Sequence, residues 1–156
     1  MSASQNKLSI SPDGESFPLP EQADYAAEYE RVKALAEAAR AKGQEVVVVM
    51  GVGFVGAVMA AIVADCTDRD GRPSKFVICC QRPSTRSFWK IPLLNRGVSP
   101  VKAEDPQVDV LIGRCVNDRK TLTATPASWG QWATRPRNSS ASARAGQPVT
   151  SMQSGS

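Results

Sequence analysis

Three glycines, Gly51, Gly53 and Gly56, are spaced as Gly-x-Gly-x-x-Gly between a run of valines and an apolar stretch. In a dinucleotide-binding loop the first glycine permits a tight turn, the second lets the backbone approach a pyrophosphate, and the third lets a helix pack close to the sheet. The N–H groups that begin the helix then attract the phosphates. The predicted cofactor-binding loop therefore consists of Gly51, Val52, Gly53, Phe54, Val55 and Gly56, with NAD as the expected cofactor and NADP as the alternative.

The residues that would meet the cofactor's ribose follow the next apolar run, residues 75–80. An acidic residue here usually binds the ribose hydroxyls of NAD, but this chain has Gln81, about thirty residues after Gly51. Gln81 can bind a ribose hydroxyl, while Arg82 and Arg86 could bind the 2′-phosphate of NADP. Alternatively, both arginines simply lie on a solvated loop. The sequence leaves the choice between NAD and NADP open.

The elements that must position these residues alternate between helix and strand. Apolar side chains at helical spacing predict a helix, four consecutive valines predict a fully buried strand, and Gly or Pro separates the elements. The predicted order is helix 24–42, strand 45–50, helix 54–64, strand 75–80, an irregular segment 82–106, helix 107–117 and strand 121–125. This order predicts an α/β fold: a partial Rossmann-like parallel sheet of about three strands, with an N-terminal helix.

Both ends of the chain differ from its middle. Residues 1–20 are rich in Ser and Pro and predict a disordered arm. Residues 126–156 contain no Asp, Glu, Leu, Ile or Phe, so they bury too little apolar surface to offset their ordering entropy and predict a disordered, low-complexity tail. The dinucleotide-binding domain is therefore predicted to span residues 21–125. The abrupt change at Pro126 also suggests a truncated or shifted reading frame.

Composition excludes several classes of protein. The 156 residues include no histidine, which removes His bases, His-activated nucleophiles and His-ligated metals. A net charge of +4 does not indicate nucleic-acid binding without a focused basic face. The N-terminus lacks a signal peptide, so we expect a cytoplasmic protein with reduced thiols. Cys66, Cys79 and Cys80 are interpreted as small core residues.

The uncharged stretch of residues 46–64 has an alternative interpretation, because it is about as long as a membrane-spanning helix. It divides, however, into a β-branched half and a helical half with two glycines at the junction, and a spanning helix has no need of that arrangement. A domain without a membrane partner is therefore favoured. A glycine turn that binds nothing remains a further alternative.

Two motifs resemble those of the UDP-glucose/GDP-mannose (nucleotide-sugar) dehydrogenase family. The first is Gly-Val-Gly-Phe-Val-Gly at residues 51–56, which we call the glycine loop. The second is Leu-Asn-Arg-Gly-Val-Ser-Pro at residues 94–100, followed by Glu104 and an apolar helix, where the family has Leu-Asn-x-Gly, Pro and Glu. Thr125 stands where the family has a threonine beside the cofactor. The likeness covers residues 45–125, and Asn-Arg-Gly at 95–97 also predicts a turn.

The resemblance implies an NAD-dependent oxidoreductase that converts the C6 alcohol of a nucleotide sugar, such as UDP-glucose, to a carboxylate. The family's catalytic cysteine and lysine lie beyond the half that this chain resembles, so no catalytic residue is assigned and the chain alone is expected to be inactive. Gln81 replaces the family's acidic ribose binder, and residues 104–106 read Glu-Asp-Pro instead of Glu-Pro-Gly. The alternative is a non-catalytic dinucleotide-binding fragment or interaction module, and a homo-oligomer is left open.

Overall fold

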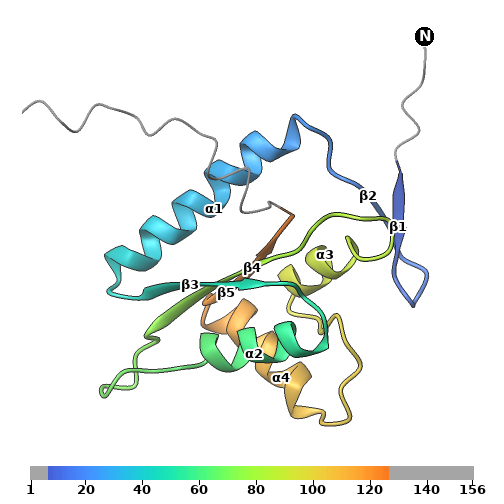
Figure 1. Ribbon diagram of the computed structural model, residues 1–156. Coiled ribbons are helices and arrows are strands. Elements are labelled where there is room, and N and C mark those ends of the chain that lie inside the picture. Colours follow the sequence, from blue (N-terminus) through green and yellow to red (C-terminus); the bar gives the residue numbers. More distant parts are fainter. Residues whose placement is uncertain (1–6, 127–156) are drawn as a thin grey trace, which may run out of the picture.

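The computed structural model describes residues 7–126 of the chain. Three strands, β3 (Glu45–Met50), β4 (Lys75–Cys80) and β5 (Leu122–Thr125), form a parallel sheet in the order β3-β4-β5 (Figure 1). The predicted α/β fold with a partial Rossmann-like sheet is confirmed. The predicted disorder of residues 126–156 falls, apart from Pro126, outside the described residues.

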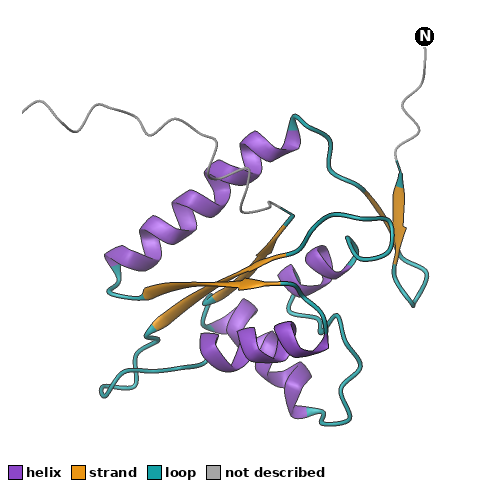
Figure 2. Ribbon diagram, in the orientation of Figure 1, coloured by secondary structure: helices purple, strands orange, loops and turns teal. Residues whose placement is uncertain are grey.

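Helices cover both faces of this sheet, as Figure 2 shows. α1 (Asp24–Ala41) packs on one face, where its buried Val32, Ala36 and Ala39 meet Phe76, Ile78 and Cys80 of β4. The other face is covered by α2 (Phe54–Ala64), by α4 (Gln107–Gly113) and by the π-helical turn η1 (Arg114–Asp118) that continues α4. The sheet therefore forms the middle of three layers, and its two faces carry two separate apolar clusters.

β3 is an edge strand, while β4 lies between its two neighbours. Val48 is 39% exposed and Met50 is 62% exposed, whereas residues 76–80 of β4 are all buried. The prediction that residues 45–50 form a fully buried strand is wrong in its burial, although the strand and its bounds are confirmed. A run of valines favours an extended backbone but does not determine whether a second strand will lie beside it.

The membrane interpretation of residues 46–64 is not supported, because the stretch is divided between β3 and α2. Within residues 7–126, no helix has the length and apolar character needed to cross a membrane.

Two short strands, β1 (Leu8–Ile10) and β2 (Ser16–Pro18), form an antiparallel hairpin. The prediction of a disordered arm over residues 1–20 is therefore wrong for residues 8–18. The buried Ser9 accepts a hydrogen bond on Oγ from the Trp89 backbone N–H, at 3.1 Å. This partner lies eighty residues away in the sequence, so the local composition carries no signal of it.

Two further contacts attach the hairpin to residues near Trp89. Phe17 is buried, and the Arg96 guanidinium lies 5.4 Å from the centre of its ring. Arg96 also forms an ion pair with Glu15 at 2.7 Å. Both side chains of that pair are exposed, so we attribute most of the attachment to the burial of Phe17.

The segment predicted as irregular, residues 82–106, contains the short helix α3 (Lys90–Asn95). Its side chains Ile91 and Leu94 are buried in the cluster beneath α2 and α4. The helix ends at Asn95, and Gly97, just beyond its cap, has φ +78° and donates its N–H to the Leu94 carbonyl at 2.9 Å. The turn predicted at residues 95–97 is therefore confirmed, with glycine in the left-handed position that closes many helices.

Candidate dinucleotide-binding site

The glycine loop joins the carboxyl end of β3 to the beginning of α2. Gly51 has φ +93°, a conformation that side chains disfavour, and donates its N–H to the Cys80 carbonyl at 2.7 Å. A Cβ on Gly56 would lie 2.1 Å from the Gly51 carbonyl oxygen, so only glycine lets α2 approach the loop this closely. The geometry fits two of the predicted tasks, the tight turn and the close packing of the helix.

Gly53 occupies the N-terminal cap of α2 and differs from the other two glycines. Its φ of −74° is available to any residue, and a Cβ built on it would have no neighbour within 4 Å. No backbone strain or protein contact therefore requires glycine here. Open space above a helix N-terminus is what a pyrophosphate needs, because the first N–H groups of a helix have no acceptor within it.

The other three residues of the predicted loop have different environments. Val52 is fully buried and belongs to the core beneath α2. Phe54 and Val55, in the first turn of α2, are 58% and 71% exposed. The first turn of α2 has no acidic side chain that would compete for its N–H groups. Phe54 and Val55 therefore present apolar surface beside the loop, while Val52 fixes the loop to the core.

The carboxyl ends of the three strands bring Gly51, Gln81 and Thr125 into one row. Gly51 is hydrogen-bonded to the end of β4, and the Gln81 N–H donates to the Thr125 carbonyl at 3.0 Å. Thr125 is fully buried. Ligands of open α/β sheets bind outside the carboxyl ends of the strands, so the fold brings these three predicted residues to the edge where a cofactor would lie.

The side chain of Gln81 is engaged within the protein. Its Oε1 accepts a hydrogen bond from the Val52 N–H at 2.9 Å, and its Nε2 donates to the Arg82 carbonyl and to Ser87 Oγ, each at 3.3 Å. We call Val52, Gln81 and Ser87 the glutamine latch, because they join the glycine loop to the loop after β4. The sequence did not indicate Ser87, since its contact depends on how that loop folds back.

Arg82 and Arg86 lie on the loop after β4 and are exposed. The backbone carbonyl of Arg86 accepts a hydrogen bond from Trp89 Nε1 at 2.9 Å, which holds the loop against α3. Among residues 7–126, neither arginine has an ion pair within 4.0 Å. Both guanidinium groups therefore lie in solvent. Arg82 is the residue that directly follows Gln81 in the sequence.

The three buried cysteine thiols of the described residues are poorly suited to act as nucleophiles. Cys79, Cys80 and Cys115 are buried, and burial raises the pKa of all three, that of Cys79 to about 12. A protonated thiol is a poor nucleophile. Cys66 is exposed, so its interpretation as a core residue is wrong. The described part of the chain holds no group of three or more acidic, Cys or His side chains that could bind a metal ion.

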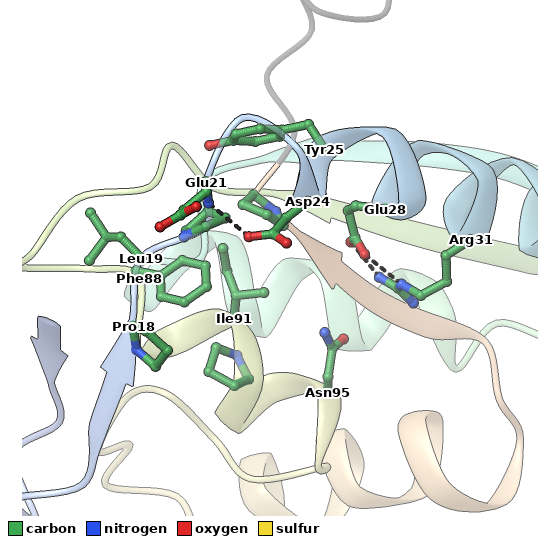
Figure 3. Close-up of a pocket in the computed structure, with 13 residues that line it drawn as sticks. Pro18, Leu19, Glu21, Asp24, Tyr25, Glu28, Arg31, Phe88, Ile91 and Asn95 are labelled. Atoms are coloured by element: carbon green, nitrogen blue, oxygen red, sulfur yellow. Dashed lines mark hydrogen bonds and ion pairs between the residues drawn. The ribbon is translucent and has the colours of Figure 1, made fainter. Parts of the chain in front are cut away.

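A cavity of about 600 Å³ lies apart from the glycine loop, between the beginning of α1, α3 and Pro126 (Figure 3). Phe88 and Ile91 form an apolar wall, and Glu28 on the opposite side is paired with Arg31 at 2.7 Å. Burial, and then the charge of Asp24, raises the pKa of Tyr25 at its rim. None of residues 51–56 lines this cavity, and no pattern in the sequence indicated it.

Comparisons with known proteins identify one similar structure. No family model matches the chain, and neither does any curated protein. An NDP-N-acetyl-D-galactosaminuronic acid dehydrogenase from Methanosarcina mazei Go1 is 34% identical over 59% of this chain, with a TM-score of 0.46. The match covers 18% of that dehydrogenase, so this chain spans less than a fifth of its length.

Proposed function

We propose that the chain binds a nicotinamide dinucleotide through the glycine loop, as the dinucleotide-binding part of an oxidoreductase that acts on a nucleotide sugar. One observation carries the proposal. At the β3–α2 junction, Gly51 turns at positive φ and Gly53 leaves open space at the helix N-terminus. Gly56 lets α2 pack close to the loop, because a Cβ on it would lie 2.1 Å from the Gly51 carbonyl oxygen. Together these features make a backbone cradle for a pyrophosphate.

The proposed cofactor would accept a hydride from the sugar alcohol, and the residues of this chain would bind and orient it. The N–H groups at the beginning of α2 would attract the pyrophosphate. Arg82 lies after the strand whose end meets the adenosine ribose in dinucleotide-binding folds. We propose no catalytic residue in this chain, since three of its thiols are buried with raised pKa values.

Titration of the full 156-residue chain with NADH and NADPH, followed by nicotinamide fluorescence, tests the binding. Gly53→Val should abolish it, because the new side chain would occupy the space left for phosphate. The fold should persist, since no protein atom lies within 4 Å of a Cβ at this position and replacing a glycine cap costs only about 1 kcal/mol.

The matched control is Ala23→Val, because Ala23 is the N-terminal cap of α1 and is exposed. It adds a similar apolar side chain at an equivalent helix position, away from the glycine loop. Cofactor affinity should be unchanged in this variant. If circular dichroism shows that both proteins are folded, equal cofactor affinity in Gly53→Val and the wild type would contradict the proposed function.

A second candidate function is a non-catalytic module that associates with another copy of the chain. Val55, Met59 and Ile62 are each about half exposed or more and recur on the outer side of α2, opposite its buried alanines. Contiguous apolar surface of this kind often marks an interface. No charged residue lies between residues 46 and 64, so two copies of this surface would not repel each other.

Sedimentation velocity and an activity assay separate the two candidates. Self-association that Met59→Lys abolishes, while Val110→Lys on the exposed side of α4 does not, would support the module. Binding of NADH or NADPH would support the first candidate, and a monomer at all concentrations would contradict the module. Because no catalytic residue is proposed in this chain, we expect no turnover of the bound cofactor on addition of UDP-glucose. Reduction of NAD or NADP by the chain alone would contradict that expectation.

A further inference from the structure

The glutamine latch leaves Gln81 with little capacity to bind a ribose. The amide oxygen, which would accept a ribose hydroxyl, already accepts the Val52 N–H at 2.9 Å. The amide nitrogen is turned toward Arg82 O and Ser87 Oγ. Binding a 2′-hydroxyl as NAD requires would break part of the latch and leave the N–H of a buried residue without a partner.

The loop after β4 carries basic residues and no acidic ones. Residues 71–103 contain no Asp or Glu, and neither do residues 46–64. Both loops at this edge of the sheet therefore lack a carboxylate of their own. Arg72, Lys75 and Arg96 are paired with acidic side chains elsewhere, whereas Arg82 and Arg86 have no ion pair within the described residues.

Side chains with hydroxyl groups lie on the same loop as these two arginines. In the sequence, Ser84 lies between the two arginines and Ser87 follows the second, and the Oγ atoms of these serines are 2.7 Å apart. Thr85 is exposed on the same loop. Guanidinium and hydroxyl groups are the usual ligands of a phosphate monoester. An uncharged ribose diol would leave the two arginines unused, while a 2′-phosphate would supply the dianion that they can bind.

From this arrangement we infer that the site selects NADP(H) over NAD(H), with Arg82 and Arg86 binding the 2′-phosphate and Gln81 holding the glycine loop instead of the ribose. The inference rests on the proposed function, because it concerns the same site. It identifies the two arginines as specificity-determining residues and Gln81 as a positioning residue.

The test compares the affinities of NADPH and NADH for the full chain and for Arg82→Ala, Arg86→Ala and Arg82→Lys. In the wild type NADPH should bind at least about tenfold more tightly, since one charge-assisted contact is worth a factor of ten or more. Each alanine variant should lose roughly tenfold to a hundredfold in NADPH affinity while NADH affinity stays within about twofold. Arg82→Lys should retain part of the preference.

Arg72→Ala is the matched control, because Arg72 is also exposed but is paired with Asp68 and Asp70 in the loop before β4. Its affinities for both cofactors should equal those of the wild type. In Gln81→Glu, a carboxylate oxygen can still accept the Val52 N–H, while the added charge should repel the 2′-phosphate. This variant should therefore weaken NADPH and spare or tighten NADH.

The outcomes distinguish the inference from the proposed function. If neither cofactor binds the folded wild type, the proposed function fails. If both bind with equal affinity, or if the alanine variants weaken both equally, the selection of NADP(H) is overturned while dinucleotide binding stands. A preference for NADPH that the alanine variants remove supports both.

Discussion

The side-chain amide of Asn95 exchanges two hydrogen bonds with the backbone of Ala124. Its Nδ2 donates to the Ala124 carbonyl at 2.9 Å, and its Oδ1 accepts the Ala124 N–H at 2.7 Å. The Thr123 hydroxyl donates to the same Oδ1 at 3.2 Å. Asn95 thereby satisfies the outer edge of β5 as a neighbouring strand would, and it attaches α3 to the sheet.

Asn95→Ala should lower the free energy of unfolding by about 2–3 kcal/mol, because it leaves the buried N–H of Ala124 without its partner. The Ala124 carbonyl would keep its hydrogen bond from Arg31. Urea denaturation followed by circular dichroism measures the change. Asn117→Ala is the control, since Asn117 makes a single long bond of 3.4 Å to the Arg96 carbonyl. Equal loss of unfolding free energy in the two variants would show that the contacts of Asn95 with β5 stabilise the fold no more than the single bond of Asn117.

The glycine loop should tolerate alanine very differently at two positions. Gly56→Ala should destabilise the chain by about 1–3 kcal/mol, because the new Cβ would lie 2.1 Å from a backbone oxygen and α2 would have to move. Gly53→Ala should cost less than about 1 kcal/mol, since nothing lies near its Cβ. Thermal melts of the two variants measure the difference, and a reversed order would contradict the packing described here.

The two sides of α2 should also differ in their tolerance of substitution. Ala61 is fully buried against the sheet, so Ala61→Leu should lower stability by about 1–3 kcal/mol through overpacking. Met59 is 51% exposed, and Met59→Gln should change stability by less than about 0.5 kcal/mol. Denaturant titration of both variants checks this. A larger loss at Met59 would mean that its side chain is covered in solution.

Stability should fall at alkaline pH partly because of Cys79. Burial, and next the neighbouring Cys80, raises its pKa from 9.0 to about 12 in the folded chain. The folded state thus favours the neutral thiol, and its contribution is full below about pH 9 and declines as pH rises toward 12. Between pH 8 and pH 10 the unfolding free energy should drop by about 1 kcal/mol from this group.

Cys79→Ala is the comparison that isolates this contribution, because Tyr and Lys side chains titrate in the same range. The pH dependence of the variant should be shallower than that of the wild type over pH 8–10. In addition, a thiol reagent at pH 8 should label Cys66 rapidly and the three buried cysteines only after denaturation. Identical pH dependence in both proteins would contradict the raised pKa.

Local sequence determined three of the elements, β3, α2 and β4, and the glycine loop between the first two. The valine run, the glycines and the apolar stretch predicted β3, α2 and β4 with the bounds that the structure has, because backbone propensity and glycine conformation act over a few residues. The alternation of these elements also indicated the parallel sheet. The predicted site residues Gly51, Gln81 and Thr125 meet because parallel strands end at one edge.

Only the tertiary structure decided which partners these elements have. The position of β3 at the edge, the hairpin at residues 8–18 and the contacts of Asn95 with β5 all depend on segments far apart in the chain. The same holds for Gln81, whose amide bonds Val52 from 29 residues away. Residue types show that a side chain can donate or accept a hydrogen bond, but the fold determines whether the protein or a ligand receives it.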